Sequence, residues 1–313
     1  MKFNKPKFWD EKIGFISLLL YPFSLVTLMI IFFKRKFSKK IYFNTPIICV
    51  GNLYLGGTGK TPTSILVAKE LSKIGKKPVI LRKFYSSHND EHELIRKNFN
   101  SLILSSDRIK GIHNAIKKKF KTVILDDGLQ DYSFKKNLNI LCFNQNQLIG
   151  NGLVLPAGPL RESLNILKDV KIVLINGEKN IRFEKKILNV NKNLNIFYSQ
   201  YMPKNIKQFK NKKLFAIAGI ANPENFFKLL SKNNLNVQKK FIYPDHYEFN
   251  KKEILNLIKE AENCNCEIIM TEKDYYKIKN FRHKSLKYLN VSLEIKNKKK
   301  LFKIISKIYD ENY

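Results

Sequence analysis

The sequence has few cysteines and far fewer acidic than basic residues. Four cysteines in 313 residues are too few and too scattered for a disulfide framework, which indicates a reducing compartment. Cys49 and Cys142 lie in apolar runs typical of strands. Cys264 and Cys266 are spaced C-x-C with no second pair and no nearby His, so we expect a loop before a strand there and no zinc site.

Acidic residues are scarce, because 26 Asp and Glu stand against 58 Lys and Arg, a formal net charge of +32. Taken alone, this charge would indicate a nucleic-acid or anionic-membrane partner. The basic residues are mostly Lys and are spread over the whole chain beside abundant Asn, Ile and Phe, which resembles drift toward A/T-rich codons. No helix-turn-helix pattern and no interleaving of aromatic and basic residues accompanies the charge. We therefore predict no nucleic-acid partner and discount the charge as a sign of function.

The N-terminal region contains 21 residues without a charge, at positions 13–33. This is about the length that a helix needs to cross a hydrocarbon core of about 30 Å. The run is too long for a signal peptide and no small-residue cleavage site follows it. Pro22 near its centre keeps a hairpin or an interfacial helix as an equal alternative to a spanning helix. Basic residues are denser after the run, which predicts that residues from 34 onward lie in the cytosol.

The rest of the chain alternates short apolar runs with helical patterns. We expect strands at 46–50, 78–81, 101–104, 122–125, 138–143 and 170–175, with helices at 61–74 and 107–119. A polar, Asn- and Lys-rich stretch at 177–213 interrupts this rhythm, and a second α/β series follows. We predict an α/β protein with three parts: an N-terminal membrane helix (1–40), a P-loop NTPase-type α/β/α domain (41–205) and a smaller α/β domain (206–313).

Residues 51–61, GNLYLGGTGKT, follow a predicted strand and precede a predicted helix, which is the context of a phosphate-binding loop. Lys60 would reach the β and γ phosphates, and the Thr61 hydroxyl would bind Mg²⁺. Tyr54 occupies the place of the first glycine of the usual pattern. A glycine-rich turn without a ligand is the weaker alternative, since Lys60 and Thr61 stand in register. The predicted nucleotide contacts are Gly56, Gly57, Thr58, Gly59, Lys60 and Thr61.

Two further segments carry charged groups suited to this chemistry. The apolar run 123–125 ends in Asp126 and Asp127, as in the second magnesium-supporting motif of P-loop enzymes. The loop 150–162 is dense in Gly and Pro, typical of a rigid connector, but Arg161 within it offers a planar fork for phosphoryl oxygens.

Two polar clusters, at 88–92 and 244–247, are either ordinary turns or functional loops. In the functional reading, a carboxylate oriented by a His takes a proton from an attacking hydroxyl. That reading depends on the two domains facing each other across a cleft.

Taken together, these motifs resemble the tetraacyldisaccharide 4'-kinase family, which phosphorylates the lipid A precursor disaccharide. The resemblance spans nearly the whole chain and is carried by the FW at Trp9, the apolar N-terminal run, VGN…GGTGKTP at 50–62, DDGLQ at 126–130, GNG…LPAGPLRE at 150–162, AGIANPENFF at 218–227, PDHY at 244–247 and TEKD at 271–274. That family also lacks the first glycine of the P-loop pattern, where Tyr54 stands here.

The resemblance implies roles for individual residues. Asp90 would be the base, assisted by His246, and Lys60 and Arg161 would complete the catalytic set. Arg108 would contact phosphates, and Thr61, Asp126 and Asp127 would support Mg²⁺. Glu91 and Glu162 are predicted to contact the substrate.

The sequence departs from the family in the segment before Asp90. The family reads RGYGG there, whereas Arg82 is followed by Lys-Phe-Tyr-Ser-Ser; Asn89 and His92 replace the Gly and Pro that flank the acidic pair, and Asp131 replaces a His. Substrate contacts in this loop are therefore expected to differ.

We predict an ATP- and Mg²⁺-dependent kinase that phosphorylates the 4'-hydroxyl of a tetraacylated glucosamine disaccharide 1-phosphate at the cytoplasmic face of a bacterial inner membrane. Its partners would be the lipid-linked disaccharide and inner-membrane lipids, with no obligate protein partner. The alternative is a membrane-associated P-loop ATPase without a phosphorylated acceptor, whose ATP turnover would not depend on the lipid.

Overall fold

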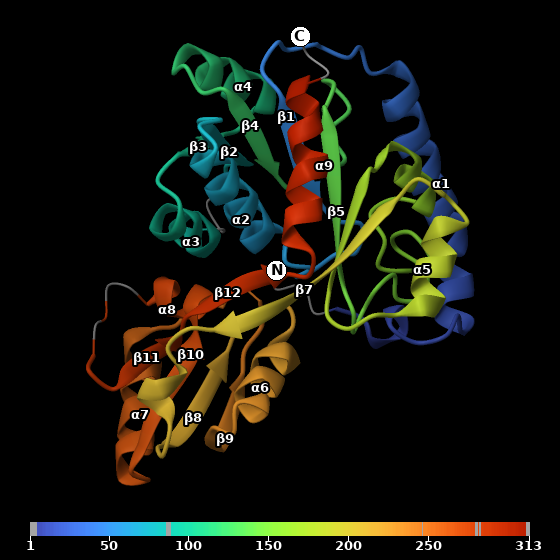
Figure 1. The fold of residues 1–313 in the computed structure, drawn as a ribbon. Coiled ribbons are helices and arrows are strands. Elements are labelled where there is room, and N and C mark those ends of the chain that lie inside the picture. The colour runs from blue at the N-terminus through green and yellow to red at the C-terminus, as the bar shows by residue number, and fades with distance from the viewer. Residues whose placement is uncertain (1–4, 86–88, 246, 279–280, 282, 311–313) are drawn as a thin grey trace. The chain divides into compact units, whose positions relative to one another are not determined.

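The structure is a computed structural model that describes residues 5–85, 89–245, 247–278, 281 and 283–310 (Figure 1). Contacts within the chain divide it into two compact units. The first, called here the P-loop unit, comprises Lys5–Phe84, Ser101–Gln200 and Glu294–Tyr313. The second unit contains Tyr85–Asn100 and Tyr201–Leu293. Each unit is described by itself below.

An eight-stranded sheet organises the P-loop unit, with the order β12-β7-β6-β5-β1-β4-β2-β3. Its central strand β1 pairs in parallel with β4 on one side and β5 on the other. The carboxyl ends of β1 and β4 therefore lie side by side at one edge of the sheet. The strands are β1 (Ile47–Gly51), β2 (Pro78–Lys83), β3 (Leu102–Ser105), β4 (Thr122–Asp126), β5 (Leu138–Asn144), β6 (Ile172–Asn176), β7 (Asn195–Pro203) and β12 (Val291–Ile295).

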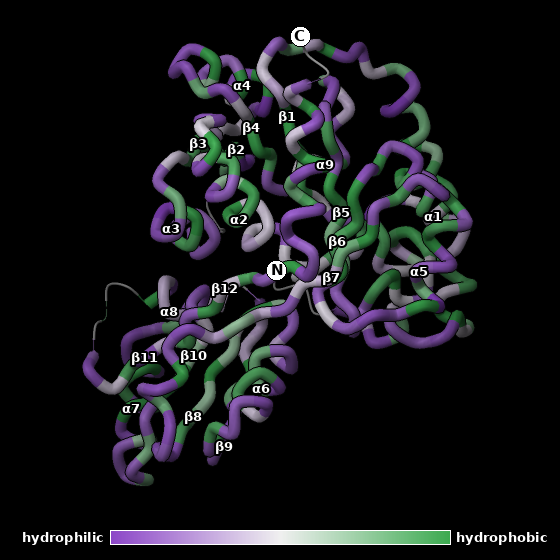
Figure 2. Tube along the Cα trace, viewed as in Figure 1, coloured by the Kyte–Doolittle hydropathy of each residue, from purple (hydrophilic) through white to green (hydrophobic). Residues whose placement is uncertain are grey.

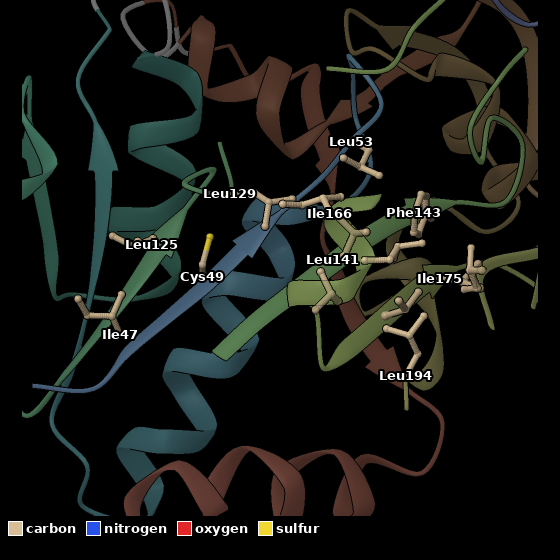
Figure 3. Packing of buried hydrophobic residues seen from close by; sticks show 14 of the residues in the cluster. Ile47, Cys49, Leu53, Leu125, Leu129, Leu141, Phe143, Ile166, Ile175 and Leu194 are labelled. Atoms are coloured by element: carbon tan, nitrogen blue, oxygen red, sulfur yellow. The ribbon is translucent and has the colours of Figure 1, made fainter. Parts of the chain in front are cut away.

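Every residue of β1 and of β4 is buried, as expected for parallel strands covered on both faces. Figure 2 colours hydrophobic residues green, in these strands as in other elements of the chain. Ile47, Cys49 and Leu125 belong to one continuous apolar core that also includes Leu141 and Phe143 of β5 (Figure 3). The helices of this unit are α1 (Phe15–Phe37), α2 (Lys60–Lys73), α4 (Arg108–Lys117), α5 (Ile181–Leu188) and α9 (Lys298–Asp310), with 3-10 turns at η1 (Lys7–Trp9) and η3 (Leu164–Asp169).

The second unit is built on a four-stranded sheet with the order β11-β10-β8-β9. The central strands β8 and β10 pair in parallel, and apolar clusters form from residues of the sheet and of α6 and α7. The elements are β8 (Lys213–Ala218), β9 (Asn236–Ile242), β10 (Cys266–Thr271), β11 (Leu286–Leu289), α3 (Asn89–Asn98), α6 (Pro223–Lys232), α7 (Lys251–Asn263), α8 (Glu272–Lys277) and the 3-10 turn η4 (Ile206–Phe209).

The predicted α/β class is confirmed, with strand and helix alternating around the P-loop. The prediction of an irregular polar connector at 177–213 is wrong, because α5 and β7 lie there. In α5, Phe183 and Ile187 are four residues apart and face the core, while Arg182, Lys185 and Lys186 are exposed. The turn alternative for 88–92 is also wrong within the described residues, since 89–92 begin α3. His88 lies outside them.

The two compact units do not follow the three contiguous ranges expected from the sequence, since residues 5–40 group with the P-loop unit and 201–205 with the second unit. Residues 85–100 group with the second unit, and 294–313 group with the P-loop unit. α3 packs against α8, and Asn98 donates to Glu272, a residue 174 positions later in the sequence. Long-range packing of this kind leaves no mark in local composition.

The N-terminal apolar run forms one continuous helix, α1, through Pro22, so a hairpin is excluded. It is long and apolar enough to cross a membrane. Its large side chains are strongly exposed, among them Phe15 at 80% and Leu19 at 63%, whereas Ser17 and Ser24 are its buried residues.

Candidate functional site

The P-loop connects the end of β1 to the start of α2. Gly59 adopts a left-handed conformation (φ 88°) directly before Lys60 and caps α2, while Gly56 has a φ of 142°. A side chain would strain both positions. The carbonyl of Gly56 accepts a hydrogen bond from Asn52 Nδ2 at 3.0 Å, which ties the loop to its own base. Thr58 is 2% exposed, and its Oγ1 has no partner among the described residues, so its burial is costly until a ligand or water bonds to it.

Lys60 lies at the first turn of α2 with its ammonium between two oxygens. Nζ donates to Asn52 Oδ1 at 3.1 Å and lies 3.6 Å from Asp127 Oδ1. Burial lowers the pKa of Lys60, and the Asp127 charge opposes that shift. A phosphate oxygen can take the place of either partner, so the Lys60 ammonium is suited to neutralising the charge of a transferred phosphoryl group.

Asp126, the last residue of β4, is fully buried and holds several groups of the site together. Its Oδ2 accepts from Thr61 Oγ1 at 2.9 Å, and its Oδ1 accepts from Ser64 Oγ at 3.0 Å. Arg82, at the carboxyl end of β2, forms an ion pair with the same carboxylate, and its NH1 also lies 3.3 Å from Thr61 Oγ1. Because β1, β4 and β2 are adjacent in the sheet, strand pairing brings these three elements to one edge.

Asp127 follows in a left-handed conformation (φ 65°), and its carboxylate lies between two cations, Lys60 and Arg161. Arg161 NH1 donates to both carboxylate oxygens at 3.0 and 3.1 Å, and Lys60 approaches the same group. Burial would raise the pKa of Asp127, but the charges of Lys60 and Arg161 outweigh it and hold the pKa well below its usual range. Asp127 is therefore ionised at neutral pH.

Arg108, at the start of α4, reaches the same edge. Its guanidinium donates to the backbone carbonyl of Asp127 and pairs with Asp131 at 3.1 Å. Asp131 thus serves as a partner of Arg108. Glu162 is only 2% exposed and accepts from Tyr132 Oη; burial raises its pKa, and the hydrogen bond opposes that shift.

The oxygen donors of this edge fit Mg²⁺. Thr61 Oγ1 and Asp126 Oδ2 are 2.9 Å apart, and Asp127 follows directly. Among the described residues there is no group of three or more His, Cys, Asp and Glu that would enclose a metal. Mg²⁺ is usually bound through one or two carboxylates, with water and substrate phosphates completing the shell. Thr61, Asp126 and Asp127 match that requirement.

Asp90 belongs to the second unit, in the first turn of α3. Its side chain is 3% exposed, and its Oδ2 lies 3.5 Å from Lys273 Nζ and 3.9 Å from Lys277 Nζ, both on α8. Lys273 also lies 3.3 Å from Glu91 and 3.0 Å from Asp245. The two predicted acidic residues of α3 therefore share one lysine. His246, the predicted assistant of Asp90, lies outside the described residues.

Asp274 connects this group of charges to the residue that follows β8, Gly219. It is fully buried, accepts from the Gly219 backbone N–H at 2.8 Å, and forms an ion pair with Lys277 at 2.7 Å. A Cβ on Gly219 would lie 2.9 Å from Asp274 Oδ1, so a side chain at 219 would disturb this contact. The segments 218–227 and 271–274 thus meet through the bond between Gly219 and Asp274, and Lys277 lies near both Asp274 and Asp90.

Several residues of these groups were not predicted as site residues. Asn52, Ser64 and Arg82 belong to the sheet edge where β1, β4 and β2 end, called here the phosphate edge. Lys273 and Lys277 complete the surroundings of Asp90. Ser64 was detectable, because it stands one helical turn after Lys60 in a helix whose start was predicted. The contacts of Arg82 and Lys277 depend on strand order and on helix packing, which the sequence does not display.

Comparison with known proteins places the chain in a family. The sequence matches the family described as tetraacyldisaccharide-1-P 4'-kinase over residues 16–310. It is 40% identical to a tetraacyldisaccharide 4'-kinase of Pelagibacter ubique over the full length of both chains, and 31% identical to that of Francisella tularensis subsp. novicida over 92% of this chain and 98% of the relative.

A solved structure supports the same relationship. The "apo" form of LpxK from Aquifex aeolicus in complex with ATP superimposes with a TM-score of 0.72 at 25% identity, covering 94% of this chain and 99% of that one. With a family match over nearly all residues and full-length relatives above 30% identity, this chain belongs to the tetraacyldisaccharide 4'-kinase family.

Proposed function

We propose that this chain transfers the γ-phosphoryl group of ATP to the 4'-hydroxyl of a tetraacylated glucosamine disaccharide 1-phosphate. The observation that carries the proposal is the cluster at the carboxyl ends of β1, β4 and β2. There, Lys60 and Arg161 converge on Asp127 while Thr61 and Arg82 converge on Asp126. Family membership supports the choice of acceptor, and the Aquifex aeolicus relative was solved with ATP.

The phosphate groups of ATP would lie on the backbone N–H groups of the P-loop, at the positive end of α2. Lys60 would exchange its contact with Asp127 for the β and γ phosphates, and Arg161 would offer its fork to the transferred group. Arg108, fixed by Asp131, would add positive charge at the same edge. Positioning and electrostatic stabilisation of this kind supply most of the acceleration in phosphoryl transfer.

Thr61, Asp126 and Asp127 would hold Mg²⁺, which when bound neutralises charge on the β and γ phosphates. Asp126 owes its fixed orientation to Ser64 and Arg82. Its carboxylate is thus held in place before any ligand arrives.

Asp90 would act as the general base. The 4'-oxygen forms a bond to the γ phosphorus, the bond from that phosphorus to the β–γ bridging oxygen breaks, the hydroxyl proton passes to an Asp90 carboxylate oxygen, and ADP leaves. His246 would assist Asp90, and Glu91 and Glu162 would contact the sugar. Support for Asp90 comes from its position in the family motif and from the two lysines beside its carboxylate.

We further propose that the chain acts at the cytoplasmic face of an inner membrane, held there by α1. Contacts along the helix favour an interfacial position over a spanning one. Ser17 and Ser24 are buried, Leu28 packs on the core of the P-loop unit, and Arg35 pairs with Asp169. A helix attached to its own domain over four to five turns is held along that domain, and its exposed apolar face would enter one leaflet.

The test is transfer of label from γ-labelled ATP to an acylated glucosamine disaccharide 1-phosphate in detergent micelles. We expect label in the lipid, and a loss of about 10²- to 10³-fold in Lys60→Ala, the range for removal of one electrostatic contact to the reacting group. Lys73→Ala is the matched control, since its ammonium is on the same helix but exposed. Label found only in free phosphate, at a rate independent of the lipid, would identify an ATPase instead.

A further inference from the structure

The helix α1 carries two buried polar side chains on an otherwise apolar and exposed surface. Ser17 and Ser24 are 0% and 1% exposed, while Leu18 and Phe23 beside them are exposed by 62% and 61%. Seven residues make about two turns, so both serines lie on one face. Buried hydroxyls in an apolar setting require hydrogen-bond partners. Those partners identify the part of the protein that this face of α1 contacts.

The partners of both serines belong to residues 150–162, called here the arginine loop because Arg161 stands near its end. Ser24 Oγ donates to the Val154 carbonyl at 2.7 Å and accepts from the Ala157 N–H at 3.1 Å. One hydroxyl thereby bridges two backbone groups three residues apart. Asn151 Nδ2 adds a bond of 3.2 Å to Ser17 Oγ.

Trp9, just before α1, holds the same loop from a second direction. Its indole Nε1 donates to the Pro156 carbonyl at 3.0 Å, and its own carbonyl accepts from the Asn151 N–H at 2.8 Å. A Cβ on Gly150 would lie 2.4 Å from the Trp9 carbonyl oxygen, so the contact depends on glycine there. Five hydrogen bonds therefore attach the first half of the arginine loop to Trp9, Ser17 and Ser24.

The second half of the arginine loop is attached to the P-loop. The Leu55 N–H donates to the Pro159 carbonyl at 2.9 Å, and the Arg161 N–H donates to the Leu53 carbonyl at 2.8 Å. These bonds place the Arg161 backbone beside the P-loop and its guanidinium on Asp127. One short loop thus joins the membrane-facing helix to the phosphate edge.

We infer that Ser24 is a positioning residue for phosphoryl transfer, and that the arginine loop couples the seating of α1 to the placement of Arg161. The inference rests on the proposed function, since it takes the P-loop as the site of ATP. Removing the hydroxyl leaves the Val154 carbonyl and the Ala157 N–H without their partner. Loosening at that end shifts the loop against the P-loop, and displacement of a phosphate-binding group by about 1 Å can cost about 10²-fold in rate.

The experiment uses Trp9, the only tryptophan in the chain, as an intrinsic reporter. The full-length protein in detergent micelles is titrated with ATP and Mg²⁺ without lipid acceptor, and Trp9 emission is recorded. Transfer kinetics are then measured against ATP and against the lipid disaccharide. We expect a saturable change in Trp9 emission, and in Ser24→Ala a smaller change together with a kcat lower by about 10-fold and an unchanged KM for the lipid.

Thr27→Val is the matched control. Its hydroxyl donates to the Phe23 carbonyl at 3.2 Å, so the variant removes a hydroxyl whose hydrogen bond lies within α1. We expect wild-type emission and kinetics. Ser17→Ala, which removes the single bond to Asn151, should shift both readouts in the same direction as Ser24→Ala but less, and it serves as the test if Ser24→Ala does not fold.

Three outcomes would overturn the inference: equal behaviour of the serine variants and Thr27→Val, a rise in KM for the lipid with kcat preserved, or Trp9 emission that does not respond to ATP. Failure of the proposed function has a different signature. In that case Trp9 emission responds to ATP and Ser24→Ala weakens the response, while no label enters the lipid in any variant.

Discussion

Asp127 and Asp90 are both held between two basic side chains, but their settings differ. Asp127 is 26% exposed and accepts from Arg161 at 3.0 and 3.1 Å, with Lys60 at 3.6 Å. Asp90 is 3% exposed, and its lysines lie farther away, at 3.5 and 3.9 Å. Both carboxylates accept hydrogen bonds, Asp127 from Arg161 and Asp90 from the Glu91 N–H at 2.9 Å, so their settings differ in burial and in the distances to the cations.

We interpret the difference as a division of labour. In the proposed function, the Asp127 carboxylate places the cations Lys60 and Arg161, which act on phosphate. In the proposed function, the Asp90 carboxylate accepts a proton from a hydroxyl, and Lys273 and Lys277 hold that carboxylate in position. Three measurements, on Asp90, on the Arg82–Asp126 pair and on Asp127, would break or sharpen the comparison of these carboxylates.

The largest effect is expected from Asp90→Asn, which keeps the size of the side chain and removes its ability to accept the proton. The kcat for transfer should fall by about 10²- to 10⁴-fold, with nucleotide affinity unchanged. Glu93→Gln is the control, because Glu93 lies on the same helix and pairs with the exposed Arg96. An Asp90→Asn enzyme with the wild-type kcat would remove the distinction between the two carboxylates.

A stability effect should separate the buried carboxylate Asp126 from surface pairs. Arg82→Met leaves the fully buried Asp126 without its cation, and breaking a buried pair from one side costs about 3–5 kcal/mol. Urea unfolding in micelles measures this as a lower midpoint. Lys73→Met, at an exposed pair with Glu70, should cost about 0–1 kcal/mol. Equal midpoints for the two variants would show that the Arg82 pair does not stabilise the fold.

The smallest effect is a dependence on pH. The pKa of Asp127 is lower in the folded than in the unfolded chain, so its carboxylate stabilises the fold at neutral pH. That contribution declines as pH falls below the unfolded value of about 3.9 and is lost once the folded pKa is passed. The difference in urea midpoint between wild type and Asp127→Asn should be constant from about pH 7 to 5 and shrink below about pH 4. A difference that grows on acidification would contradict the assigned direction of the shift.

Local patterns predicted the parts of the molecule that depend on neighbours in the chain. The strand before the P-loop and the helix after it were found because apolar runs and glycines change there within a few residues. The Asp pair was found because it ends an apolar strand. By contrast, α5 and β7 were missed, because exposed Asn and Lys hid the few core-facing residues such as Phe183.

By itself, the sequence determined the α/β class, the phosphate-binding loop, the apolar N-terminal helix and, through the order of its motifs, the family. The tertiary structure decided which groups surround each functional residue: Arg82 against Asp126, Lys277 against Asp90, and Ser24 against the arginine loop. Strand order, helix packing and loop docking create those contacts between residues 44 to 187 positions apart, and the contact of Thr122 with Tyr309 also spans 187 positions. Periodicity and spacing describe a residue's neighbours within a few positions along the chain, so contacts between distant residues cannot be predicted from them.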